Sequence, residues 1–110
     1  MPALERLTTL LERYLVLMDT KTSLLAAIGD ACSGQRRVEK FQTPGYQWAH
    51  NTITAVLTEA VANGELRPID PSFTADALLA ALSADVYQFQ RDVRGKTKDE
   101  ILQGIRSIIA

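Results

Sequence analysis

Cys32 and His50 are the one pair of side chains in this 110-residue sequence that could act together as a thiol nucleophile and its general base. Nucleophilic catalysis requires both groups within hydrogen-bond reach and a third group that orients the base. The two residues fall on different predicted helices, and no pattern brings them together. Glycine-rich phosphate loops and paired-carboxylate motifs are also absent. We therefore expect a chain that is not an enzyme, with Cys32 as a small buried hydrophobic residue and His50 as a polar pocket or surface residue.

Metal and disulfide chemistry are limited by the same two residues. One histidine cannot complete a metal site that needs two, and one cysteine cannot form an internal disulfide. We expect no metal and no cofactor.

The charge distribution argues against direct contact with nucleic acid. Twelve Lys and Arg stand against thirteen Asp and Glu, a net charge of −1, whereas nucleic-acid-binding domains are usually basic. The most basic segment has acidic residues but no aromatic residues among its cations, so it lacks the stacking platform of a single-strand binder. It is interpreted as a solvated connection, with the cations Arg91, Arg94, Lys96 and Lys98.

Length and hydropathy describe one globular domain over residues 1–110. Hydrophobic residues make up 46% of the chain, enough for a core without disulfide support. No apolar run approaches the roughly 18 residues of a membrane span. The first residues mix acids with apolar side chains, unlike a signal peptide. We expect a cytoplasmic protein with no membrane contact.

Apolar spacings of three and four residues predict helices throughout, and no segment alternates as a strand would. Pro44 and Gly45 indicate an irregular segment over 34–45. Gly64 is placed to end the third helix, and Thr97 with Glu100 forms a capping box before the last. The predicted fold is an all-α, five-helix bundle-like domain with helices over 2–19, 20–34, 46–63, 72–92 and 97–109.

The last two predicted helices carry more apolar surface than four short neighbours are expected to cover. Small residues there, including Gly104, favour close helix packing. One interpretation is an ordinary core. The other is a twofold interface in which both copies contribute two helices to an intersubunit four-helix bundle, and Ile105→Asp is then expected to dissociate the homodimer. The residues predicted for this interface are Leu78, Ala81, Leu82, Phe89, Ile101, Ile105 and Ile108.

A ligand site in a helical domain is expected between helices, mostly apolar with a few polar groups. Large or polar-tipped side chains near the centres of the predicted helices are candidates to line it. Each one taken singly fits the core better, and the prediction rests on the group. No constellation of charges is present to pair with a charged ligand, so the expected ligand is apolar or aromatic. The candidates are Tyr14, Met18, Ile28, Trp48, Thr52 and Tyr87.

Residues 57–82 (LTEAVANGELRPIDPSFTADALLAAL) resemble the C-terminal regulatory domains of TetR-family transcriptional regulators, and the SbtR-like subgroup is the most similar. In that family a helix ends in a Gly-Glu-Leu-Arg type of turn, a connector follows, and two final helices dimerise. The resemblance extends loosely from Leu4 to Ile109. It implies a ligand-binding and dimerisation module whose small-molecule effector modulates DNA binding by population shift.

The chain departs from these regulators because no segment pairs a short helix, a tight turn and a basic recognition helix. An N-terminal helix-turn-helix domain is thus absent from this sequence, which we expect to sense and dimerise but not to read DNA. The alternative is a helical protein–protein interaction module that binds no ligand.

Overall fold

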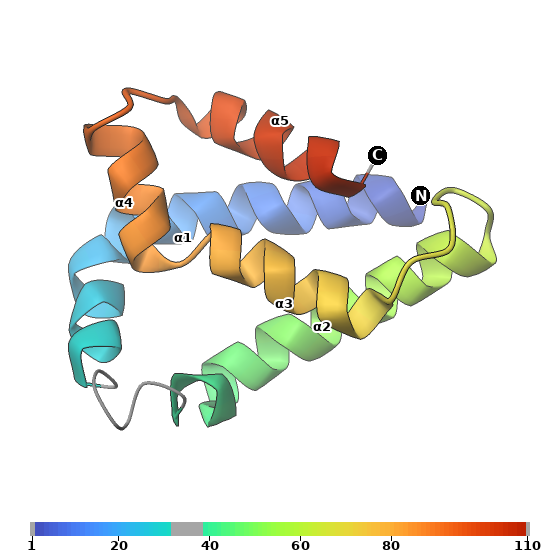
Figure 1. Cartoon of the computed structure of the whole chain (residues 1–110), viewed down its shortest axis with the longest axis horizontal. Coiled ribbons are helices and arrows are strands. Elements are labelled where there is room, and N and C mark those ends of the chain that lie inside the picture. The colour runs from blue at the N-terminus through green and yellow to red at the C-terminus, as the bar shows by residue number, and fades with distance from the viewer. Residues whose placement is uncertain (1, 32–38, 110) are drawn as a thin grey trace.

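The computed structural model describes the backbone of residues 2–31 and 39–109, and the side chains of residues 2–19 and 41–109. The described part is all-helical and contains no strand, as the sequence predicts (Figure 1). A 3-10 helix, η2 (Glu39–Gln42), accompanies five α-helices, which are α1 (Ala3–Ala31), α2 (Pro44–Ala62), α3 (Pro71–Ala81), α4 (Ala84–Asp92) and α5 (Lys98–Ile109).

The helices divide the chain differently from the prediction, although their number agrees. The two helices expected before residue 34 form one helix, α1, of 29 residues. Figure 1 shows that α1 changes direction where α4 crosses it, so that its last turns run towards the start of α2. The expected break is therefore a bend rather than an interruption.

The helix predicted over 72–92 is interrupted at Leu82 and Ser83, where the backbone of Ser83 is extended (ψ 153°). The interruption changes which side chains are buried. Leu82 is fully buried, but Val86 and Phe89, which would follow it on one face of a continuous helix, are exposed, and Tyr87 is buried instead. The turn at Ser83 thus directs α4 onto α1 and leaves one side of α4 uncovered.

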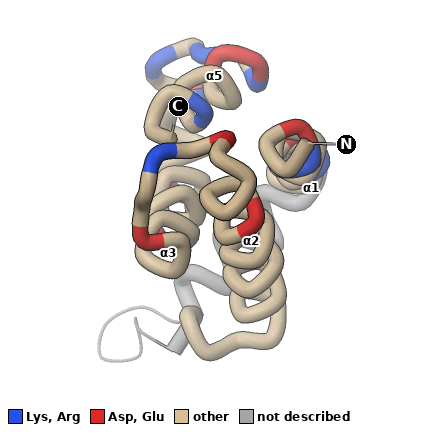
Figure 2. The backbone as a smooth tube through the Cα atoms, turned by 90° about the vertical axis from the view of Figure 1, so that its right-hand side faces the viewer, with Lys and Arg blue, Asp and Glu red and all other residues tan. Residues whose placement is uncertain are grey.

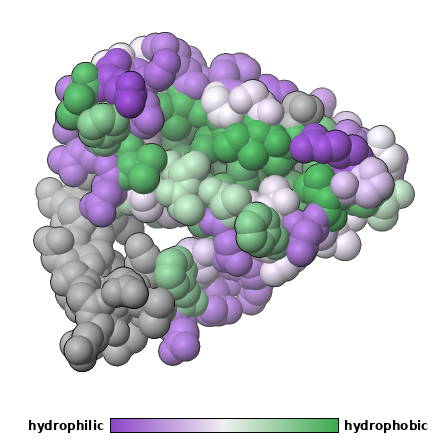
Figure 3. All heavy atoms as spheres, in the orientation of Figure 1, coloured by the Kyte–Doolittle hydropathy of each residue, from purple (hydrophilic) through white to green (hydrophobic). Residues whose placement is uncertain are grey.

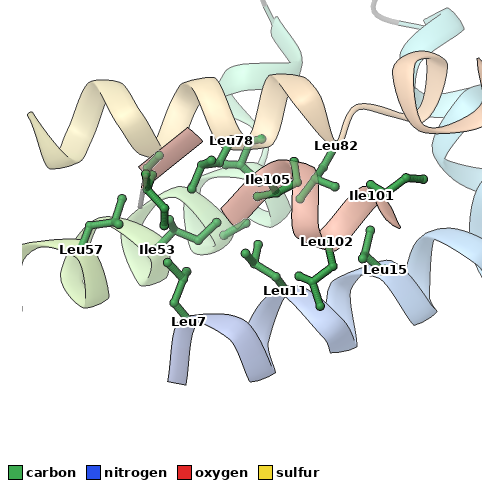
Figure 4. Close-up of a cluster of buried hydrophobic side chains, with 14 of the residues drawn as sticks. Leu7, Leu11, Leu15, Ile53, Leu57, Leu78, Leu82, Ile101, Leu102 and Ile105 are labelled. Carbon is green, nitrogen blue, oxygen red and sulfur yellow. The ribbon is translucent and has the colours of Figure 1, made fainter. Parts of the chain in front are cut away.

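Most of the core of the described residues comes from α1, α2, α3 and α5, and Tyr87 of α4 also belongs to it. Figure 4 shows side chains from α1, α2, α3 and α5 converging on one cluster. Each of these large aliphatic groups gains roughly 1.5–3 kcal/mol from leaving water. Side chains at most 8% exposed include Leu7, Leu11 and Leu15 from α1, Ile53 and Leu57 from α2, Leu78 and Leu82 at the end of α3, and Ile101, Leu102 and Ile105 from α5.

The arrangement is visible along the bundle in Figure 2, where α2 lies between α1 and α3 and α5 lies above them. Charged residues are concentrated in the connection that leads into α5. The capping box predicted there is confirmed, because Thr97 Oγ1 accepts from the Glu100 amide at 3.1 Å and Glu100 Oε1 accepts from the Thr97 amide at 3.2 Å. This reciprocal cap fixes the start of α5.

The turn after α2 is the one predicted, and it does more than end the helix. Gly64 takes a positive φ of 75°, the left-handed conformation that a glycine adopts without strain. The carboxylate of Glu65 accepts from the amides of Ala3 (3.1 Å) and Leu4 (3.2 Å) and so caps α1. Arg67 Nη1 donates to the carbonyl of Ile109 at 3.2 Å, in the last turn of α5. One turn therefore holds the first turn of α1 and the last turn of α5.

Candidate functional site

The residues predicted to line a ligand pocket lie in different environments. Met18 and Tyr87 are 1% and 2% exposed and belong to the core. Trp48 is 63% exposed, so its ring faces solvent rather than a cavity. The side chain of Ile28 lies outside the described residues. The two remaining candidates, Tyr14 and Thr52, are half-buried.

Thr52 uses its hydroxyl locally, because Oγ1 donates to the carbonyl of Trp48 at 2.7 Å, one turn earlier in α2. Burial raises the pKa of Tyr14. The five candidates whose side chains the structure describes are therefore not gathered around one space.

Among the hollows on the described residues are two that no predicted pocket residue lines. One has a volume of about 40 Å³ and lies between α1 and α5, with Leu4, Leu11, Leu66 and Arg106 in its lining. The other, of about 120 Å³, is lined by Glu12, Leu15, Val16, Lys98, Asp99 and Leu102. Sites for drug-sized ligands typically measure about 300–1,000 Å³. Both hollows are too small for such a ligand.

The residues predicted for a subunit interface separate into two groups. Leu78, Leu82, Ile101 and Ile105 are at most 8% exposed and pack in the core of their own chain. Ala81 is half-buried against that core. Phe89 and Ile108 are 43% and 49% exposed, so of the seven they alone offer a large apolar side chain to a second molecule.

Exposed apolar side chains gather on α4. Val86 and Phe89 of α4 are 40% and 43% exposed, and Val93, the C-cap residue that follows the helix, is 70% exposed. Their spacing of three and four residues puts them on one side of α4 and its cap. We call these three residues the α4 face. The guanidinium of Arg94 lies 5.0 Å from the centre of the Phe89 ring, a cation–π distance.

Figure 3 shows hydrophobic atoms over α4 and between α3 and α5, on one side of the molecule. Phe73 of α3 and Ile108 of α5 are also exposed, at 71% and 49%. Soluble monomers rarely expose large contiguous apolar patches, and such patches mark interaction sites. The α4 face is therefore the candidate functional surface.

The carboxylate of Asp19, which was not identified from the sequence, contacts α4 on the side that packs against α1. The Tyr87 hydroxyl donates to Asp19 of α1. Arg91 Nε and Lys98 Nζ lie 3.4 Å and 3.5 Å from the same carboxylate. We call these four residues the Asp19 cluster. No local sequence pattern predicts the Asp19 cluster, because Asp19 and Tyr87 are 68 positions apart.

The Asp19 cluster changes the acidity of two of its members. Burial would raise the pKa of Asp19, but the Tyr87 hydrogen bond and the positive charges of Arg91 and Lys98 outweigh it and lower the value below its usual 3.8. Burial and the nearby carboxylate raise the pKa of the Tyr87 phenol above its usual 10.0. Both shifts favour an ionised Asp19 that accepts from a neutral tyrosine.

A second tyrosine–carboxylate pair joins α2 to α3. Tyr46 Oη donates to Asp76 Oδ1 at 2.5 Å. His50 Nε2 lies 3.2 Å from the Ser72 carbonyl and 3.6 Å from Asp76 Oδ1. Ser72 Oγ also lies 3.4 Å from Nε2, so both polar atoms of Ser72 are within hydrogen-bond distance of this ring nitrogen. His50 ties two helices together, while Cys32, its conceivable nucleophile, lies outside the described residues.

Within the described ranges, no three His, Cys, Asp or Glu side chains lie together as metal ligands would. No helix in those ranges combines the length and hydropathy of a membrane span. Comparison with protein-family models, with curated proteins and with solved structures gave no match of any of the three kinds.

Proposed function

We propose that this chain is the effector-sensing and dimerisation domain of a TetR-type transcriptional regulator, and that it self-associates as a homodimer through its last helices. The observation that carries the proposal is the α4 face, three exposed apolar side chains on one side of a short helix and its cap, together with exposed Ile108 on α5. A second copy of the chain would cover this surface. DNA would be contacted only through a separate helix-turn-helix domain.

The proposed interface uses fewer residues than the intersubunit bundle predicted from the sequence. Leu78, Leu82, Ile101 and Ile105 already pack within their own chain. The contribution of α5 to the interface therefore rests on its outer side, at Ile108, while α4 and its cap supply Val86, Phe89 and Val93. Twofold symmetry would place the same surface of both copies in contact.

Analytical ultracentrifugation of the wild-type chain and of Phe89→Asp tests the dimer. The wild type is expected to sediment with twice the mass of one chain at tens of micromolar, and Phe89→Asp as a monomer with an unchanged helical circular-dichroism spectrum. Trp48→Asp is the matched control, because it places the same charge at another exposed aromatic position, on α2. A wild-type chain that remains monomeric, or a Phe89→Asp variant that remains dimeric, contradicts the proposed interface.

Effector sensing rests on the resemblance of residues 57–82, and the proposed effector is a small, largely apolar molecule. A thermal-shift series with apolar and aromatic metabolites tests this part. A ligand present at 100 times its dissociation constant should add about 2.7 kcal/mol of stability. A series without any shift would favour the second candidate below.

The second candidate is a helical interaction module that binds no ligand. One observation favours it, namely that the two hollows measure only about 40 Å³ and 120 Å³. In this case the α4 face would contact a different protein. A monomeric wild-type chain that shows no thermal shift is the result expected of this candidate.

A further inference from the structure

We infer that Asp19 is the positioning residue that couples the course of α1 to the strength of the subunit interface. The inference rests on the proposed function, since it requires the α4 face to be the dimer contact. Asp19 itself lies behind α4 and is not part of that contact.

The first step of the argument concerns how α4 is held. The helix has nine residues, and the side chain of Ser83 makes no cap hydrogen bond at its start. Isolated helices shorter than about 12–15 residues are marginal in water. Within α4, all of which the structure describes, Tyr87 is the one buried residue. The position of α4 therefore depends mainly on what Tyr87 contacts, since Ala84, which also packs against the core, is small and only partly buried.

The second step concerns what lies behind Tyr87. Its hydroxyl donates to Asp19, and Arg91 Nε, one turn later on α4, lies 3.4 Å from the same carboxylate. The Asp19 side chain thus fixes α4 at two points, and Lys98 Nζ at 3.5 Å extends the cluster to the first residue of α5. Arg91 Nη1 also donates to the Lys96 carbonyl at 3.0 Å, which holds the connection between α4 and α5.

The third step concerns the opposite side of α4. Val86 comes directly before Tyr87 in the sequence, and Phe89 comes two positions after it. Both side chains face outward, at 40% and 43% exposure. A short rigid helix carries both surfaces, so a shift of its inner side moves the α4 face by a similar amount. Figure 1 shows that α1 bends where α4 crosses it. A change in that bend would therefore reach the interface through Asp19.

By reciprocity, dimerisation would also fix the bend of α1. An effector that favoured one course of α1 would then change the affinity between subunits, which is the kind of regulation that the proposed function needs. Typical coupling between two sites corresponds to about 5–150-fold in affinity. The hydrogen bond and ion pairs of the Asp19 cluster form a contiguous connection through which α1 and the interface would be coupled.

The test measures the dimer dissociation constant by sedimentation equilibrium at neutral pH, well below the melting temperature. Asp19→Asn removes the charge, and Tyr87→Phe removes one hydroxyl while keeping the ring, so the second variant serves if the first folds poorly. Both are expected to raise the dissociation constant at least fivefold. The matched controls Asp76→Asn and Tyr46→Phe break the equivalent pair between α2 and α3 and are expected to leave it within about twofold.

Two results would overturn the inference while the dimer stands. One is a dissociation constant that neither Asp19→Asn nor Tyr87→Phe changes. The other is an equal weakening by the Asp76→Asn control, which would show a general loss of stability rather than coupling. A wild-type chain that does not self-associate at all contradicts the proposed function itself, and the coupling with it.

Discussion

The helices α4 and α5 look alike in sequence, since both carry enough apolar residues to make an interface, but the structure uses them in opposite ways. α5 buries Ile101, Leu102 and Ile105 in its own chain, and its start is closed by a capping box. α4 buries Tyr87 alone among its residues, all of them described, and has no side-chain cap. An apolar stripe thus shows that a helix side must be covered, but not which molecule covers it.

The largest expected effect distinguishes the inner side of α5 from its outer side. Ile105 is 4% exposed, so Ile105→Asp would bury an unpaired carboxylate and is expected to cost about 4 kcal/mol or more of folding free energy. Ile108 is 49% exposed on the same helix, and at a concentration low enough to keep the chain monomeric, Ile108→Asp is expected to change stability by about 0.5 kcal/mol or less. Urea denaturation of the two variants gives the comparison.

The burial of Ile105 also corrects the expectation that Ile105→Asp would dissociate the homodimer. Because Ile105 packs inside its own chain, the variant reports on folding rather than on subunit contact. If Ile105→Asp remained folded with near wild-type stability, the assignment of α5 to the core would be wrong, and the two helices would be equivalent after all.

A smaller effect separates the starts of the two helices. Thr97→Ala removes the hydroxyl that accepts from the Glu100 amide at 3.1 Å and is expected to cost about 1 kcal/mol. Ser83→Ala removes a hydroxyl that makes no cap hydrogen bond, so its cost is expected to be a few tenths of a kcal/mol. Thermal denaturation followed by circular dichroism measures both. Equal losses would show that α4 is capped as well as α5.

The smallest expected effect is a pH dependence of stability that arises from the Asp19 carboxylate, which contacts α4. The folded-state pKa of Asp19 is lowered from 3.8 by its hydrogen bond and positive neighbours. Its contribution to stability is therefore complete above the unfolded value and is lost as the pH falls through the folded value. Glu65 and Glu100 have lowered pKa values for similar reasons, so acid alone would not identify Asp19.

Subtraction isolates Asp19. The difference in urea midpoint between the wild type and Asp19→Asn is expected to be constant from pH 7 to pH 5. It is expected to shrink below about pH 4, where Asp19 of the unfolded chain becomes protonated, and to disappear once the pH has fallen through the lowered folded-state pKa. A difference that stayed unchanged down to pH 2 would show that the negative charge of Asp19 contributes nothing to holding α4.

Local patterns predicted much of the fold and little of the site. The all-α class, the left-handed Gly64 and the Thr97–Glu100 cap follow from spacing and residue type, and each is confirmed. The break at Ser83 was not predicted, because it carries neither proline nor glycine and the apolar spacing continues through it. The Asp19–Tyr87 contact was not predictable either, because it joins positions 68 apart.

The described residues of the predicted pocket do not line one space, for a related reason. Periodicity ranks side chains by their place along a helix, whereas a cavity depends on how far apart the helices stand. Trp48 lies off the main stripe of α2, which favoured a cavity, but that side of α2 is exposed.

The Gly64–Arg67 turn has a consequence for the order in which the chain can fold. The first turn of α1 owes two of its amide partners to Glu65, 61 and 62 positions away, and Arg67 reaches the last turn of α5. A ribosome delivers Ala3 long before Glu65, so the first turn of α1 emerges without its cap. During synthesis the first turn of α1 gains these two partners only once Glu65 has been made, and Arg67 gains its carbonyl partner only once Ile109 has been made.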